Sequence, residues 1–172
     1  NRAQQVGWAQ YSGGSWQDPQ FLSETTGPYA SGMMDSDGNV HLAYMQPADQ
    51  SLEYRVVGGS GPETVVDGVR DTGNAYVLAD IGEDTDLRIK SDGSVQVFYH
   101  DATWHELHVA TRDGSGSWTD EVLTAPGDPY SGAHGLFFDL VQGDASSDLA
   151  VEYVINNQAD PRTATPAFPA AP

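Results

Sequence analysis

Three histidines lie close together in the segment YHDATWHELHVA, residues 99–110. His100, His105 and His108 carry imidazole nitrogens, which are common ligands of zinc and copper. If DATWH forms a hairpin loop, His100 and His108 lie on neighbouring strands and His105 lies at the tip, where three imidazoles could meet one metal ion. The same residues also fit an exposed, pH-sensitive hairpin of a repeated unit. We adopt the hairpin interpretation and keep the metal site as the alternative.

A second set of potential metal ligands is DSDGN, residues 35–39. Asp35, Asp37 and Asn39 place oxygen atoms at alternate positions, as the start of a Ca²⁺ loop does. The glycine and glutamate that an EF-hand has at positions 6 and 12 are missing here. A tight Asp-Gly hairpin turn explains the same residues, because such turns need residues with φ > 0. No cofactor is predicted, and Ca²⁺ at these three residues is the alternative.

Aromatic residues are the candidates for ligand binding. Exposed rings stack on the apolar faces of sugars or anchor contacts with other proteins. The candidate residues are Trp104, Tyr76, Tyr29 and Tyr130. Trp16 and Trp118, in contrast, recur at one position of an internal repeat, and for that reason they are predicted to lie in the core.

No catalytic residue is predicted. Glycoside hydrolysis needs two facing carboxylates, and none of the 25 acidic residues stands out from the others. The few arginines are scattered along the chain, and the nucleophile elbow and phosphate loop are both missing. The absence of cysteine excludes thiolate chemistry, disulfides and cysteine-based zinc sites.

The elements that position these residues belong to an internal repeat. The segment SDGNVHLAYMQPADQSLEYR, residues 36–55, aligns without a gap with residues 91–110. The identical pairs are Ser36 and Ser91, Asp37 and Asp92, Gly38 and Gly93, Val40 and Val95, Tyr44 and Tyr99, and Leu52 and Leu107. In this alignment the three histidines correspond to Met45, Gln50 and Glu53, so the other copy carries no equivalent ligand set.

Short alternating apolar runs separated by Gly, Asp, Ser and Pro predict antiparallel strands and almost no helix. Further matches join GGSWQDPQFL, residues 13–22, to GSGSWTDEVL, residues 114–123, and DLAVEYV, residues 148–154, to residues 39–45. Four antiparallel strands in about 50 residues make a propeller blade. The prediction is an all-β chain with about three blades' worth of strands in residues 1–156 and a Pro/Ala-rich tail in residues 157–172. The ring would then be completed by oligomerisation or by further chain.

Composition narrows the classes of partner. A chain of 172 residues predicts one domain. Its net charge of -18 repels a phosphate backbone and an anionic membrane surface, so nucleic acid is not an expected partner. No apolar segment reaches the roughly 20 residues that span a bilayer, so membrane insertion is not expected either.

The segments DSDGNVHLAYMQPADQSLEYR and KSDGSVQVFYHDATWHELHVA resemble the "D.dG..H.aYyd.....L.yA" repeats of secreted bacterial β-propeller proteins, which are relatives of the sialidase-type (BNR or Asp-box) propellers. The resemblance covers residues 4–154 and implies an extracellular or cell-surface protein. The Asp-box itself is matched only in part. The function expected first is a non-catalytic binding or scaffold module, lectin-like where its ligand is a carbohydrate. The alternatives are a sialidase-like or other glycan-cleaving propeller, and a processed subunit of a larger extracellular complex. Expected partners are a second copy or other propeller chains, and a glycan.

Overall fold

The structure is a computed structural model and describes residues 4–71, 76–127, 132–142, 148–155 and 165–167. Every regular element in these ranges is a β-strand, and paired strands run antiparallel. The predicted all-β class is therefore confirmed. Among these residues no helix has the length and apolar character needed to cross a membrane.

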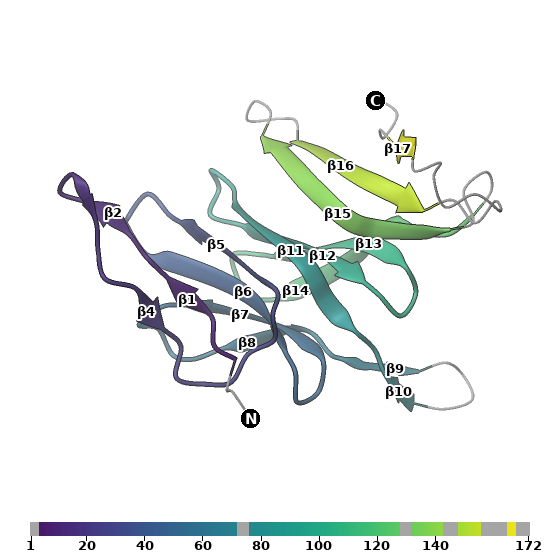
Figure 1. The fold of residues 1–172 in the computed structure, drawn as a ribbon, viewed down its shortest axis with the longest axis horizontal. Coiled ribbons are helices and arrows are strands. Elements are labelled where there is room, and N and C mark those ends of the chain that lie inside the picture. The colour runs from purple at the N-terminus through teal and green to yellow at the C-terminus, as the bar shows by residue number, and fades with distance from the viewer. Residues whose placement is uncertain (1–3, 72–75, 128–131, 143–147, 156–164, 168–172) are drawn as a thin grey trace.

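Two four-stranded sheets form the centre of the molecule (Figure 1). The first sheet contains β5 (Ala30–Met34), β6 (Val40–Gln46), β7 (Ser51–Val56) and β8 (Glu63–Val66). The second sheet contains β11 (Ile81–Ile89), β12 (Val95–Asp101), β13 (Glu106–Arg112) and β14 (Trp118–Thr124). Strands lie beside one another in chain order in both sheets. This arrangement confirms the predicted four-stranded antiparallel unit.

Smaller sheets flank these two. The third sheet contains β15 (Ala133–Gln142), β16 (Asp148–Ile155) and β17 (Thr165–Ala167). The amino-terminal hairpin, residues 6–22, contains β1 (Gly7–Trp8), β2 (Tyr11–Ser12), β3 (Ser15–Trp16) and β4 (Gln20–Phe21). A short pair is formed by β9 (Val69–Asp71) and β10 (Tyr76–Leu78). Strand β17 lies within the predicted tail and pairs with β16.

The two copies of the repeat have the same turns. Gly38 and Gly93 both have positive φ, at 86° and 83°, in the turns that join β5 to β6 and β11 to β12. Gln50 and His105 occupy equivalent positions in the next hairpin loop and have nearly equal φ of 58° and 59°. Asn, Asp and His adopt this left-handed conformation more often than other non-glycine residues. The alignment made from sequence is therefore correct in three dimensions.

The sheets pack face to face because each strand directs alternate side chains to opposite faces. The largest apolar cluster lies between the first and second sheets, and a smaller one joins the second sheet to the third. A third cluster joins the amino-terminal hairpin to the first sheet. Hairpin, first sheet, second sheet and third sheet therefore follow one another in series (Figure 1). The described ranges of the chain do not close into a ring.

The prediction that Trp16 lies in the core is wrong. Trp118 packs edge to face on Tyr54 of the first sheet, with ring centroids 5.4 Å apart. Trp16 is 71% exposed, and the ring contact it makes is with Tyr11 of its own hairpin. The difference arises because Trp118 has a preceding sheet to pack on. In the described part of the chain no sheet lies on the corresponding side of the hairpin.

Candidate functional site

The histidine segment forms the predicted hairpin, but its strand register separates the imidazoles. His100 lies opposite Leu107, and His108 lies opposite Tyr99. Opposite residues of an antiparallel pair share a face and successive residues alternate, so His100 and His108 point to different faces of the second sheet. His105 is exposed in the loop between them. The shared metal site that was the alternative for these three residues is therefore not formed. No group of three His, Asp or Glu side chains in the described ranges is placed to hold a metal ion.

His108 lies on the face of the second sheet that packs against the first sheet, and side chains of its own sheet surround it. Its ring stacks on Tyr99 with centroids 5.0 Å apart. Its Nδ1 lies 3.0 Å from Asp120 Oδ2, and its Nε2 lies 3.0 Å from Glu106 Oε2. Burial by itself lowers the pKa of His108, but the hydrogen bonds and charges of Asp120 and Glu106 outweigh burial and raise it. This histidine is therefore held between two carboxylates of its own sheet.

The residues of the predicted Ca²⁺ alternative form a closed turn. Asp35 Oδ1 accepts hydrogen bonds from the backbone N–H groups of Asp37 and Asn39. Asp35 Oδ2 accepts from the Asn39 amide and contacts His41 Nε2 at 3.1 Å. A carboxylate has about four acceptor positions, and the turn and His41 use all of them. These hydrogen bonds, that of the Asn39 side chain first, lower the pKa of Asp35.

Two of the four predicted aromatic residues have described side chains. Trp104 lies in the β12–β13 loop and is 43% exposed. Tyr29 precedes β5 and is partly buried. Tyr76 begins β10, but its side chain lies outside the described part of the structure, and Tyr130 lies outside the described residues altogether. Trp104 and Tyr29 are therefore the aromatic candidates that the structure places.

The loops that carry these residues are joined through Asp80. The Gln50 amide donates to Asp80 Oδ1 at 2.7 Å, and the Asp80 N–H donates to Thr103 Oγ1 at 2.9 Å. The backbone N–H of Ala102 donates to the Asp80 carbonyl at 2.9 Å. These bonds connect the β6–β7 loop, the start of β11 and the β12–β13 loop. We refer to this region, residues 47–50, 79–80 and 102–105, as the loop end.

Next to the loop end lies a group of polar residues that we call the Glu83 site. Glu83 and Asp84 lie on β11, Asp80 directly precedes that strand, His100 lies on β12 and Tyr29 directly precedes β5. Two irregularities of strand pairing flank Glu83, where Gly82 and Asp84 have positive φ of 86° and 48°. The Tyr29 hydroxyl donates a hydrogen bond to Glu83. Asp84 Oδ2 accepts from the Phe138 N–H of the third sheet at 3.1 Å. The site therefore contacts segments of all three sheets.

Negative charge accumulates at this site. Burial raises the pKa of Glu83, and the charges of Asp80 and Asp84 raise it further. Burial also raises the pKa of Asp84. The charge of Glu83 is the largest cause that raises the pKa of Tyr29, with burial and the charges of Asp84 and Asp80 adding to it. Each of these shifts is the response expected of groups that lie near like charges or away from water.

His100 lies behind Glu83. Its side chain is 2% exposed, and its Nδ1 is 3.8 Å from Glu83 Oε2, which is longer than a hydrogen bond. Neither ring nitrogen has a hydrogen-bond partner. Burial lowers the pKa of His100 to about 4, so the ring is neutral at pH 7. Gly135 makes room for it, since a Cβ there would lie 3.0 Å from His100 Cδ2.

In the Tyr29–Glu83 pair, the Tyr29 hydroxyl is a potential nucleophile and the Glu83 carboxylate is a potential base. Tyrosine is the nucleophile of sialidases. The electrostatics of the pair oppose that use, because the surrounding carboxylates keep the phenol protonated. Of three arginines with described side chains, Arg55 pairs with Glu24, Arg112 pairs with Glu63, and the buried Arg88 of β11 lies close enough to Asp86 for its charge to lower the pKa of that carboxyl group. The pair therefore gives the glycan-cleaving alternative little support.

Sequence reasoning did not single out Asp80, Glu83 and Asp84. The signal was present in ADIGEDTDLRI, residues 79–89, where four acids fall in or directly before the segment that forms β11. Charged residues are almost never fully buried without partners. Four acids in and beside one strand of a packed sheet were therefore a sign of a polar site.

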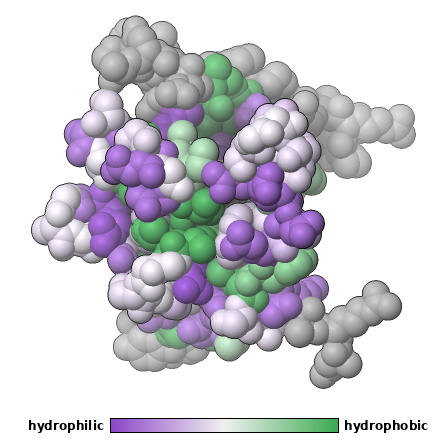
Figure 2. Space-filling view, turned by 90° about the vertical axis from the view of Figure 1, so that its left-hand side faces the viewer, coloured by the Kyte–Doolittle hydropathy of each residue, from purple (hydrophilic) through white to green (hydrophobic). Residues whose placement is uncertain are grey.

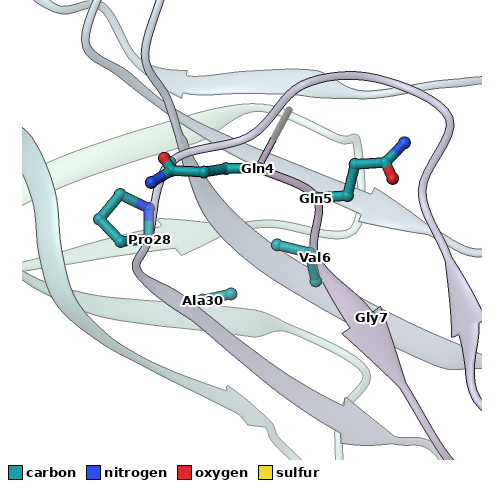
Figure 3. A pocket seen from close by; sticks show the side chains of 7 residues that line it. Gln4, Gln5, Val6, Gly7, Pro28 and Ala30 are labelled. Atoms are coloured by element: carbon teal, nitrogen blue, oxygen red, sulfur yellow. The ribbon is translucent and has the colours of Figure 1, made fainter. Parts of the chain in front are cut away.

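A second candidate region lies between the amino-terminal hairpin and the first sheet. One cavity of about 400 Å³ is lined by Gln4, Gln5, Val6, Gly7, Gly27, Pro28 and Ala30 (Figure 3). Within it, the Gln4 side chain extends toward Pro28, whereas that of Gln5 points away. A neighbouring cavity of about 330 Å³ is lined by Trp8, Ala9, Gln10, Tyr11, Gly32, Met33, Met34, Val40 and Leu42. Apolar residues gather in the middle of the face at this end of the molecule (Figure 2).

Comparison with known protein families finds none that matches the chain, and comparison with curated proteins finds no match either.

Proposed function

We propose that this chain is a non-catalytic extracellular binding module that binds glycans at its loop end. The observation that carries the proposal is the exposed ring of Trp104 on a loop whose backbone is held in place. Asp101 Oδ1 accepts hydrogen bonds from the N–H groups of Thr103 and Trp104 at 2.9 and 3.1 Å. The carbonyl of His105 accepts from the N–H of His134 on the third sheet at 3.0 Å. A binding residue held in this way loses little freedom when a ligand binds.

The chemistry around Trp104 suits a sugar. An indole ring offers a large apolar surface for the C–H face of a pyranose, and few rotatable bonds must be ordered on binding. The Asp80 carboxylate and the Gln50 amide, which are joined at 2.7 Å, can accept from and donate to sugar hydroxyls. A small number of polar groups beside an apolar surface is the usual composition of a ligand site.

Trp104→Ala should weaken glycan binding by about tenfold or more, because burying an aromatic side chain contributes roughly 1.5 to 3 kcal/mol. A glycan array identifies a ligand, and calorimetry with the soluble oligosaccharide gives the Kd. Val141→Ala is the control, since it truncates an exposed apolar side chain on β15, outside the loop end and the proposed ring contact, and should leave the Kd unchanged. Equal affinity of wild type and Trp104→Ala, or an array without any bound glycan, would contradict the proposal.

We also propose that the four-stranded sheets are blades of a propeller whose ring is completed by a second copy or by other propeller chains. Support comes from the serial packing of the sheets and from the exposed rings of Tyr11, Trp16 and Phe21. The amino-terminal hairpin presents two outer strands, and no inner pair lies beside them in the described part of the chain. The cavity lined by Trp8 and Met34 lies on this side of the first sheet. An inner strand pair of a partner would cover these groups.

Light scattering tests this assembly. A ring of two copies should have about twice the chain mass of 18.4 kDa. Trp16→Glu should return it to the mass of one chain, because a charge in an apolar contact is costly. Val122→Glu, on the outer strand β14, is the control and should leave the mass unchanged. A wild-type mass of one chain would rule out the second copy as the partner.

A further inference from the structure

The Glu83 site concentrates the negative charges of Asp80, Glu83 and Asp84 beside the Tyr29 hydroxyl. Asp80, Glu83 and Asp84 are close enough for their charges to act on one another and on Tyr29. Glu83 and Asp84 are both partly buried, where charges are screened less than at the surface. The side chain of Glu83 keeps 29% of its surface exposed, so a ligand can reach its carboxylate.

His100 gives an independent indication that a ligand belongs at this site. A buried polar group without a hydrogen bond costs about 1 to 3 kcal/mol, and such groups are rare in folded proteins. Both ring nitrogens of His100 lack a partner, and Nδ1 faces Glu83 Oε2 at 3.8 Å. In the Nε2–H tautomer, Nδ1 is a hydrogen-bond acceptor. The neutral imidazole and the carboxylate therefore present two acceptors that one donor with two N–H groups can bridge.

We infer that the Glu83 site binds the ammonium group of an amine-bearing sugar, with Glu83 and His100 as acceptors and Asp80 and Asp84 as neighbouring charges. This inference rests on the proposed glycan-binding function and adds the chemical class of the ligand. Asp80 connects the two regions, because it belongs both to the Glu83 site and to the loop end that carries Trp104.

An ammonium group fits this site better than a metal ion. Among the described side chains no group of three His, Asp or Glu is placed for metal coordination. An ammonium group needs only acceptors at hydrogen-bond distance, and it provides up to three N–H donors. The net charge of -18 also raises the local concentration of cationic ligands near the protein.

The test compares two soluble hexasaccharides by calorimetry in mildly acidic buffer. One is the hexamer of N-acetylglucosamine, which is neutral, and the other is the hexamer of glucosamine, which carries protonated amines. Wild type should bind the amine hexamer about tenfold more tightly, as expected for a hydrogen bond to a charged group. Glu83→Gln should reduce this ratio to near one. Glu121→Gln, on the exposed face of β14, removes the same charge elsewhere and should keep the wild-type ratio.

The possible results of this experiment distinguish the role of Glu83, the preference for amines and the proposed glycan binding. If both variants lower the ratio equally, the preference comes from the overall charge, and the inference about Glu83 is overturned. If wild type binds both hexamers with equal affinity, the inference fails while the proposed glycan-binding function stands. If wild type binds neither hexamer, amine recognition at this site is overturned, and the Trp104 experiment with the array ligand decides the proposed function separately.

Discussion

Leu52→Ala will lower the free energy of unfolding by about 2 to 5 kcal/mol, the range for leucine truncation in a packed core. Leu52 has no exposed surface and belongs to the cluster that joins the first and second sheets. Its Cδ1 also lies 3.1 Å from the position that a Cβ of Gly82 would occupy, so Leu52 packs directly against the backbone at the start of β11. Chemical denaturation of wild type and variant measures the difference.

The matched control is Leu123→Ala on β14, where the leucine side chain is exposed. Surface substitutions of this kind usually change stability by no more than about 0.5 kcal/mol. A loss below about 1 kcal/mol for Leu52→Ala would show that the two four-stranded sheets do not share a packed interface. The expected loss is a large part of the 5 to 15 kcal/mol that stabilises a typical domain.

Acid will destabilise the protein through His100, by about 3 kcal/mol between pH 6.5 and pH 4. Burial lowers the pKa of His100 from 6.5 to about 4 in the folded chain. Below pH 6.5 the unfolded chain binds a proton at this imidazole and the folded chain does not. The contribution of neutral His100 to the free energy of unfolding is therefore fully present above pH 6.5 and is lost as the pH falls toward 4.

His100→Met should reduce this acid sensitivity and keep the fold, because Met45 occupies the equivalent position of the other repeat. Thermal unfolding of wild type and variant at a series of pH values measures the difference. His108 acts in the opposite direction, since its raised pKa gives stability below pH 6.5 that is lost at higher pH. For this reason the test uses the difference in stability between wild type and His100→Met at each pH. If that difference stays constant between pH 6.5 and pH 4, the prediction is contradicted.

The repeat and its turns were predictable because they depend on local chain properties. Gly38 and Gly93 were recognised as turn residues from the Asp-Gly pairs, and both have the positive φ that such turns require. The equivalence of Gln50 and His105 followed from an ungapped alignment and is confirmed by their backbone conformation. Alternation of apolar residues likewise predicted the strands of both four-stranded sheets.

The chemistry of the histidines was not predictable in the same way. Adjacent positions in the hairpin suggested a shared site for His100 and His108, but a register that sets His100 opposite Leu107 sends the two rings to different faces. Trp16 and Trp118 occupy equivalent repeat positions, and their burial differs because only Trp118 has a preceding sheet to cover it.

The sequence by itself determined the all-β class, the four-stranded unit and the positions of the turns, because φ preferences and side-chain alternation act over a few residues. Only the tertiary structure decided which side chains meet between the sheets. Tyr29 reaches Glu83 and Asp84 reaches Phe138 across more than 50 positions of the chain. The raised pKa values of Glu83 and Asp84 and the unpartnered ring of His100 arise from that packing, since burial and charge at a site depend on neighbours in space.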